Sequence, residues 1–300
     1  MKKSLLTLSL GLATLATAGE TVDTMQYGLP DSGLAPSFAE ATYISRLRQR
    51  HGGSHMSMQS YALTIPLADP RKSHWNEWMI NAQLDSKITI FETGGSLTLK
   101  DEVLYNVALP ISLIKPMSNG NRITLGVAPE IATDGNAIEH GLDLAAYGLY
   151  TIRRNESFSY TIGVGISPRF AVHGAVPFFG FQWKPNEDWT VHMQGYKLTA
   201  LYKVTDKWSV GPFANAAGGI WSVETERGDE YFRLRSLVLG VTSEYDFSAP
   251  GQTKRIFAVS IGTNVATNAE FLKRNAEKDA VESHHYKPGL YVSAAVDFRF

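Results

Sequence analysis

The sequence predicts an all-β fold, a closed antiparallel up-and-down transmembrane β-barrel of about 12–14 strands. Two observations support this. Most of the chain falls into segments of about ten residues in which apolar and polar side chains alternate, which places them on opposite faces of a strand. No segment after the N-terminus approaches the roughly 20 continuous apolar residues of a membrane helix, so strands must make any membrane crossing.

The N-terminus has the three parts of a secretory signal. A basic start at Lys2 and Lys3 precedes an apolar run from Leu5 to Leu15, which is too short to span a bilayer. Ala16-Thr17-Ala18 then supplies a small-x-small cleavage pattern. We therefore expect residues 1–18 to be a signal peptide, residues 19–37 a periplasmic lead-in rich in turn formers, and residues 38–300 the barrel.

Composition restricts how the chain is stabilised and what it binds. The 300 residues include no Cys, so an exported chain of this sequence must rely on packing and on a closed hydrogen-bond network. A formal net charge of -1 gives no electrostatic reason to expect a nucleic-acid partner. The mean hydropathy of -0.14 is compatible with a barrel, because alternating strands average a lipid-facing and a polar face.

The clearest strand pattern runs from Trp78 to Ile90. Every second residue is apolar or small, and the residues between include Asn81, Asp85 and Lys87. A helical period would wind the apolar set around the helix, whereas a period of two places it on one face. Further candidate strands with this alternation are Phe38–Arg50, Met56–Leu67, Glu102–Lys115, Ile123–Ile131, Leu142–Ile152, Phe158–Ile166, Trp208–Val223, Tyr231–Phe247 and Arg255–Thr267.

A short internal repeat predicts two similar turns. Trp183–Val191 and Tyr202–Val210 both read as an aromatic residue, Lys, a polar turn, Trp, a hydroxyl residue and Val. Trp and Tyr favour the membrane–water boundary, so these turns predict a periplasmic aromatic girdle, although such residues also start strands well in other folds. The girdle residues are Tyr150, Phe158, Trp183, Trp189, Tyr202 and Trp208.

The last strand, Pro288–Phe300, alternates from Leu290 to Phe298 and ends on an aromatic residue. This ending resembles the C-terminal signature of bacterial outer-membrane β-barrels, which the barrel-assembly machinery reads. The resemblance implies an assembly signal formed by Val296, Phe298 and Phe300. Because such barrels have an even strand number with both termini in the periplasm, Asn268–Lys287 is expected to be a polar, helix-prone extracellular loop.

From about Tyr105 onward the chain is similar to outer-membrane β-barrel families of unknown function. The similarity rests on VLYNVALPI, on VPFFGFQWKPNEDWTV with ALYKVTDKWSV, and on the closing VDFRF. It implies a β-barrel in the outer membrane of a Gram-negative cell, with no established activity.

Polar residues on the other face of these strands are candidates for the lumen. They either line a water-filled channel and set its ion preference, or pair with one another and plug the lumen, and their mixed signs favour no strong selectivity. The candidates are Asp85, Lys87, Asn106, Asp143, Lys203, Glu244, Asp246, Asp297 and Arg299.

Neither a catalytic group nor a metal site is predicted. His55-Met56-Ser57 has the His-x-Ser spacing of a nucleophilic pair, but two common residues match it readily by chance. Several histidines and acidic residues fall on the extracellular side, without the ligand spacing of a metal site. They are His51, His55, His140, His173, His284, His285, Asp134, Glu139 and Glu282.

These patterns predict a porin-like passive channel or small-solute transporter of unknown specificity, without a cofactor. The expected partners are outer-membrane lipid, the assembly machinery and small solutes. The alternative is a non-conducting structural or adhesive barrel whose extracellular loops, chiefly Asn268–Lys287, bind a partner. A lipid-modifying enzyme that uses His55 is a third, weaker hypothesis.

Overall fold

The computed structural model describes residues 36–299, apart from 51–53, 69–71, 95–96, 167–174, 195, 250–253 and 274–275. The predicted signal peptide, nearly all of the lead-in, Phe300, His51 and His173 lie outside the described residues.

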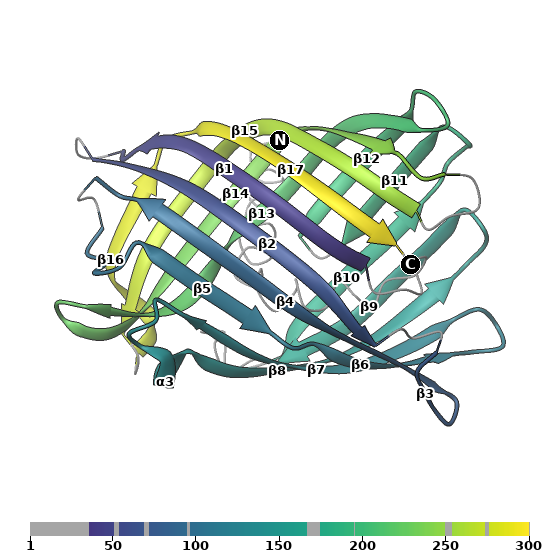
Figure 1. Cartoon of the computed structure of the whole chain (residues 1–300), viewed down its shortest axis with the longest axis horizontal. Helices are drawn as coiled ribbons and strands as arrows, with labels where there is room; N and C mark the ends of the chain where they lie inside the picture. The colour runs from purple at the N-terminus through teal and green to yellow at the C-terminus, as the bar shows by residue number, and fades with distance from the viewer. Residues whose placement is uncertain are drawn as a thin grey trace, which may run out of the picture.

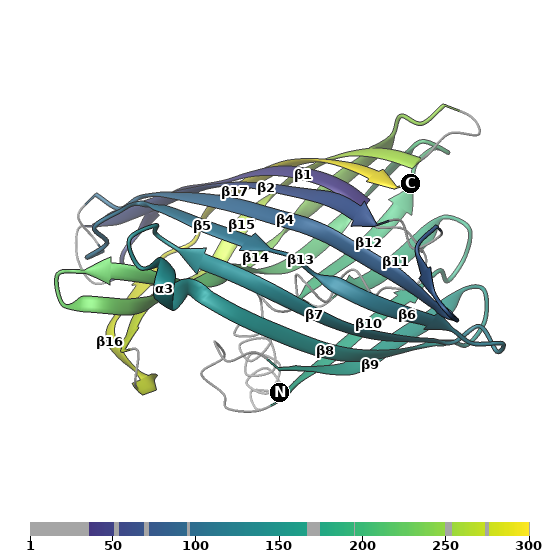
Figure 2. The ribbon, with the colours of Figure 1, turned by 60° about the horizontal axis from the view of Figure 1, so that its bottom comes forward.

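A single sheet of antiparallel strands forms a closed barrel, seen from two directions in Figures 1 and 2. The strands are β1 (Pro36–Arg48), β2 (His55–Ala68), β3 (His74–Trp75), β4 (Trp78–Glu92), β5 (Val103–Ala108), β6 (Ile111–Pro116), β7 (Arg122–Thr133), β8 (Leu142–Arg153), β9 (Phe158–Ile166), β10 (Val176–Trp183), β11 (Trp189–Gln194), β12 (Lys197–Lys203), β13 (Trp208–Thr225), β14 (Gly228–Asp246), β15 (Lys254–Lys273), β16 (Ala276–Tyr286) and β17 (Gly289–Arg299).

These strands occupy 14 positions in the wall. β5 and β6 together fill one position between β4 and β7, because both pair with both neighbours. β16 and β17 likewise share one position beside β15, interrupted near Pro288. β3 only extends a turn beside β4. The structure therefore confirms the predicted closed antiparallel barrel, at the upper end of the expected strand number.

Pairing of the first strand with the last closes the barrel. β1 and β17 run antiparallel, with Pro36 opposite Arg299 and Ile44 opposite Tyr291. The first and last described residues therefore meet at one end of the barrel, which we call the near end; the opposite end is the far end (Figure 1).

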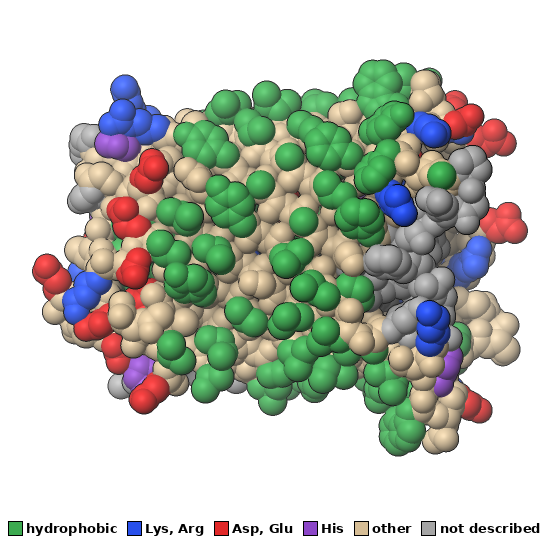
Figure 3. All heavy atoms as spheres, in the orientation of Figure 1, with side chains coloured by type: hydrophobic (Ala, Val, Ile, Leu, Met, Phe, Trp, Pro, Cys, Tyr) green, Lys and Arg blue, Asp and Glu red, His purple; other side chains and the backbone are tan. Residues whose placement is uncertain are grey.

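The outer surface of the barrel is apolar. Val241 and Ile261 are 48% and 56% exposed on neighbouring strands, and similar side chains cover the face shown in Figure 3 from close to one end to the other. Charged side chains on that face gather at the two ends. The inner face carries many buried Ser, Thr, Asn and Gln side chains besides its apolar ones, whereas the outer face between the ends is apolar. No helix in the described residues is long and apolar enough to cross a membrane.

The wall has very uneven height. β13, β14 and β15 are 18, 19 and 20 residues long, whereas β11 and β12 have only 6 and 7 residues. The long strands extend past the short ones at the far end (Figure 2). A four-residue helix, α3 (Ile138–Gly141), lies beside them at that end and contacts β7 and β13.

The structure corrects the expectation that Asn268–Lys287 is a helix-prone loop. β15 continues through Lys273, and β16 returns alongside it from Ala276 to Tyr286. The reason is that inward- and outward-facing residues alternate in this segment, although most of its residues are polar. Phe271 and Tyr286 are fully buried in the apolar core, while the exposed Ser283 and His285 lie on the other face.

Candidate functional site: the closed interior

Aromatic side chains fill the far half of the interior. Phe91 on β4 packs edge-on against Trp221 on β13 and Phe232 on β14, with ring centroids 6.2 and 5.5 Å apart. Phe232 also contacts Phe271 on β15 at 5.2 Å. β4 and β13 lie on nearly opposite sides of the wall, so these contacts span the interior. We call this set, Phe91, Trp221, Phe232 and Phe271, the aromatic plug; it lies within a larger apolar core that includes Ile44, Leu47, Met56, Leu104, Val223 and Tyr286.

The long strands reach across the barrel to close the far end. Ser222 on β13 forms a parallel bridge with Thr133 on β7, and the Asp134 N–H donates to the Ser222 carbonyl at 3.1 Å. The Asp134 carboxylate is 3% exposed and accepts the N–H groups of Asn136 and Ala137 on one oxygen, at 2.9 and 3.0 Å. Its other oxygen accepts the Glu224 N–H at 2.7 Å. Asp134 therefore fastens the end of β7 to β13. This contact closes the far end across a smaller ring of strands, which does not include β8–β12.

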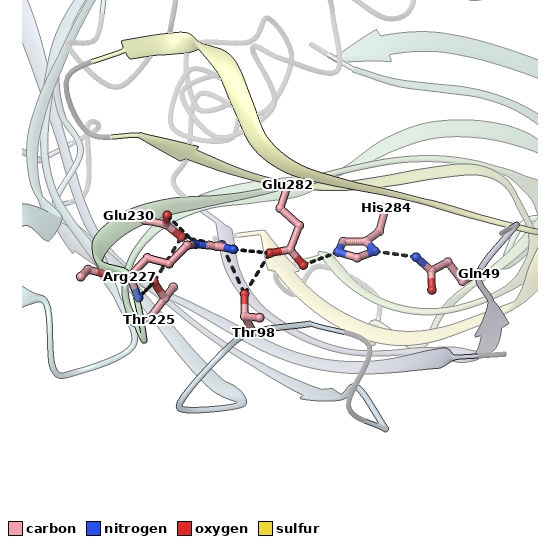
Figure 4. Close-up of polar contacts among 8 residues, drawn as sticks. Gln49, Thr98, Thr225, Arg227, Glu230, Glu282 and His284 are labelled. Atoms are coloured by element: carbon pink, nitrogen blue, oxygen red, sulfur yellow. Dashed lines mark hydrogen bonds and ion pairs between the residues drawn. The ribbon is translucent and has the colours of Figure 1, made fainter. Parts of the chain in front are cut away.

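A chain of polar contacts ties the far-end segments together (Figure 4). Arg227, in the β13–β14 turn, donates to Glu230 at 2.9 and 3.0 Å and to Glu282 of β16 at 2.7 Å. Glu282 also accepts one hydrogen bond from the Thr98 hydroxyl at 3.1 Å. It contacts His284, whose other ring nitrogen lies 2.6 Å from the Gln49 amide nitrogen. The hydrogen bonds that Arg227 donates to the Glu230 and Glu282 carboxylates raise its pKa above the usual range, despite partial desolvation. The guanidinium thus keeps its charge across the physiological pH range.

Polar groups line the interior beneath the aromatic plug. Asp85 accepts a hydrogen bond from Thr64 at 2.7 Å, and Lys87 reaches across to the Gly218 carbonyl of β13 at 3.5 Å. Asn106 donates to the buried Glu130 at 2.7 Å. Glu130 and Asp143 are directly opposite one another on β7 and β8. This level of the interior therefore holds three carboxylates and one ammonium group.

The other lumen candidates lie at the near mouth. Lys203 is bound to Asp206 of the adjacent turn at 2.7 Å, and Asp246 accepts hydrogen bonds from Ser248. In the strand register, Glu244 lies opposite Ser209, and Asp297 lies opposite the buried Ile256. The Arg299 side chain lies outside what the structure describes. A cavity of about 180 Å³ opens at this end, lined in part by Met79, Arg122, Thr151, Ser159 and Gln182.

The predicted girdle residues lie along the near ends of their strands. Trp183 pairs with Phe158, and the Trp189 and Tyr202 rings are 5.3 Å apart. Trp208 is exposed opposite Tyr245, and the Tyr150 hydroxyl accepts a hydrogen bond from Asn121 in the neighbouring turn at 2.8 Å. Of the assembly-signal residues, Val296 pairs with the outward-facing Phe257, and Phe298 contacts Phe247 edge-on at 6.4 Å.

The His-x-Ser residues have separate partners. A His55 ring nitrogen lies 3.1 Å from the Arg46 guanidinium, whereas the Ser57 hydroxyl donates to Glu92 at 2.7 Å. Among the histidines predicted to lie on the extracellular side, His140 pairs with Asp229 at 3.0 Å, and His284 belongs to the network of Figure 4. In the part of the chain that the structure describes, no three His, Asp or Glu side chains are placed to hold a metal ion.

The family described as "Domain of unknown function (DUF6268)" matches residues 37–299, nearly the whole barrel. The chain belongs to this family. The membership confirms the expected relationship to a family of unknown function and carries no activity with it. No curated protein matches the chain.

Several solved structures of outer-membrane proteins are similar to this member of the DUF6268 family. The COG4313 outer membrane channel from Pseudomonas putida F1 has 11% identity and a TM-score of 0.48, over 91% of this chain and 99% of that one. The toluene transporter TodX of P. putida has 10% identity and a TM-score of 0.36, over 92% and 91%. The KdgM porin has 8% identity and a TM-score of 0.33, over 88% and 99%. At these values the similarities assign no solute to this chain.

Sequence reasoning missed Glu130 and the aromatic plug. Glu130 could have been found, because it shares the parity of the inward-facing Thr124 and Ala132. Phe91 is separated by an even number of residues from Asp85 and Lys87 on the same strand. The alternation therefore already predicted that Phe91 faces the interior. What that parity could not reveal is that aromatic residues from four strands meet there.

Proposed function

We propose that the protein is an outer-membrane channel for small solutes that is closed at its extracellular end. The observation that carries this proposal is a lumen of two parts, polar with a cavity at the near end and closed by the aromatic plug at the far end. The near end carries the first and last described residues, Pro36 and Arg299, and the short aromatic-flanked turns, so we place it in the periplasm. The apolar exterior is then the surface that meets lipid.

The polar interior supports a solute path better than a purely structural role. Side-chain oxygens of Asn81, Gln83, Thr124 and Thr199 are buried on the interior face without a hydrogen-bond partner in the described residues. Leaving such groups unsatisfied costs about 1–3 kcal/mol each, so this interior favours water or a polar solute. Conduction then requires the far-end closure to open, because buried apolar side chains, including the aromatic plug, occupy the described interior of that half.

Planar-bilayer recordings of the purified, refolded protein test this function. We expect brief, infrequent openings of the wild-type barrel, because the closed state is held by both packing and the Asp134 contacts. The plug itself favours a second candidate, a non-conducting barrel whose far end binds a partner. A complete absence of openings in any salt and at any voltage would reject the channel and leave that candidate.

A further inference from the structure

The wall of the barrel is lowest at β11 and β12. At about 3.3 Å per residue, their 6 and 7 residues measure roughly 20 and 23 Å along the strand. With the usual tilt of about 35–45°, they rise roughly 14–19 Å, whereas the apolar band of an outer-membrane barrel is about 25 Å tall. These two strands therefore end within the hydrocarbon layer rather than above it.

The neighbouring strands continue past this low wall. β12 stops pairing with β13 at Lys197 and Asn215, although β13 runs on to Thr225. One residue further along β13, the Ala216 N–H donates to the Tyr196 carbonyl at 3.2 Å. The next described strand contact on this edge of β13 is the bridge from Ser222 to β7. On the other side, β10 pairs with β11 only between Phe181 and Trp183. The described sheet thus has a notch bounded by β10 and β13.

The interior beside the notch is apolar, unlike the polar interior around it. Tyr147, Leu149 and Phe178 form a buried cluster on the inner face of β8 and β10, and Val176 and Tyr196 pack against it. This cluster is separate from the core that holds the aromatic plug. It lines this part of the interior with apolar side chains, from Tyr196 beside the low wall to Tyr147 and Leu149 on β8.

We propose that the low wall of β11 and β12 is a lateral port, through which small apolar molecules dissolved in the outer leaflet pass between membrane and lumen. The proposal rests on the proposed membrane location. It names a route that bypasses the aromatic plug, because the notch lies on the side of the barrel that the β7–β13 closure leaves out.

The test uses the absence of Cys in the natural sequence, which makes every single-Cys label unique. A nitroxide is attached at Phe178→Cys in the full chain in liposomes, and its collisions with oxygen, a small apolar probe, are compared with those of a water-soluble nickel chelate. Phe178 is inward-facing and only 4% exposed in the protein. The port predicts high oxygen and low nickel accessibility there, approaching the values at the lipid-facing Phe179→Cys, which is 47% exposed.

Tyr291→Cys is the matched interior control, because Tyr291 is also inward-facing and buried but lies on a distant strand. The port predicts low oxygen accessibility at this position. A label at Phe178 that resembles the Tyr291 label would overturn the proposal, as would one reached mainly by the nickel chelate. Val176→Cys provides an independent position if the first variant does not fold. The result does not depend on conductance, so a lateral port in a barrel without ion openings would reject only the aqueous channel.

Discussion

Replacing both Trp221 and Phe232 with alanine is expected to open the far end of the barrel. Both side chains are almost fully buried and contact each other and Phe91 across the interior. Each truncation of a buried aromatic residue removes about 3–5 kcal/mol of packing. Since about 1.4 kcal/mol changes a population tenfold, the open state should increase by more than a hundredfold relative to wild type. Planar-bilayer recordings should show larger and far more frequent openings.

The matched control removes two aromatic rings from the outer face. Phe179→Ala with Phe257→Ala deletes exposed side chains of similar size on β10 and β15. This variant should conduct as the wild type does. In both double variants, migration on a detergent gel that still changes on boiling would show that the barrel is folded. Equal conductance of the two folded variants would then show that the aromatic core does not close the lumen.

Asp134→Ala is expected to release β13 from β7. The substitution removes a buried carboxylate that accepts three backbone N–H groups, from Asn136, Ala137 and Glu224. Hydrogen bonds to charged groups contribute about 1.5–3 kcal/mol each, and the freed N–H groups would remain without these acceptors. Local opening should therefore increase at least about tenfold, measured as faster amide exchange in the peptide that contains Ser222–Thr225.

Asp229→Ala is the control for this prediction, because Asp229 lies at the same end and pairs with His140 while 39% exposed. An exposed pair of this kind contributes about 0–1 kcal/mol. Its exchange should therefore stay close to that of the wild type. If both variants exchange alike, the Asp134 contacts do not fasten the closure.

The exterior of the barrel could be predicted from sequence because apolar and polar residues alternate along most strands, although bulges shift this alternation within β1 and β15. The alternation around Trp78–Ile90 gave the correct strand, β4, and the two repeated turns fell at one end of the barrel as expected. Period two is a local property, so it survives without knowledge of any neighbouring strand.

The closure of the far end could not be predicted in this way. It depends on which strands outgrow their neighbours and on contacts between residues distant in sequence, such as Thr133 with Ser222. The loop prediction for Asn268–Lys287 was wrong because it rested on the polar composition of this segment. The few apolar residues there, Phe271 among them, are spaced so that they face the core, as in a strand. The structure describes the positions of the lumen candidates, apart from the Arg299 side chain, whereas their roles in conduction are predictions.

Cell fractionation combined with gel migration tests the central claim, that this chain is a lipid-embedded outer-membrane barrel. We expect recovery in the outer-membrane fraction and migration on a detergent gel that changes when the sample is boiled, because a closed sheet without edges resists the detergent until heated. Recovery in the soluble fraction, with migration that is independent of boiling, would contradict it.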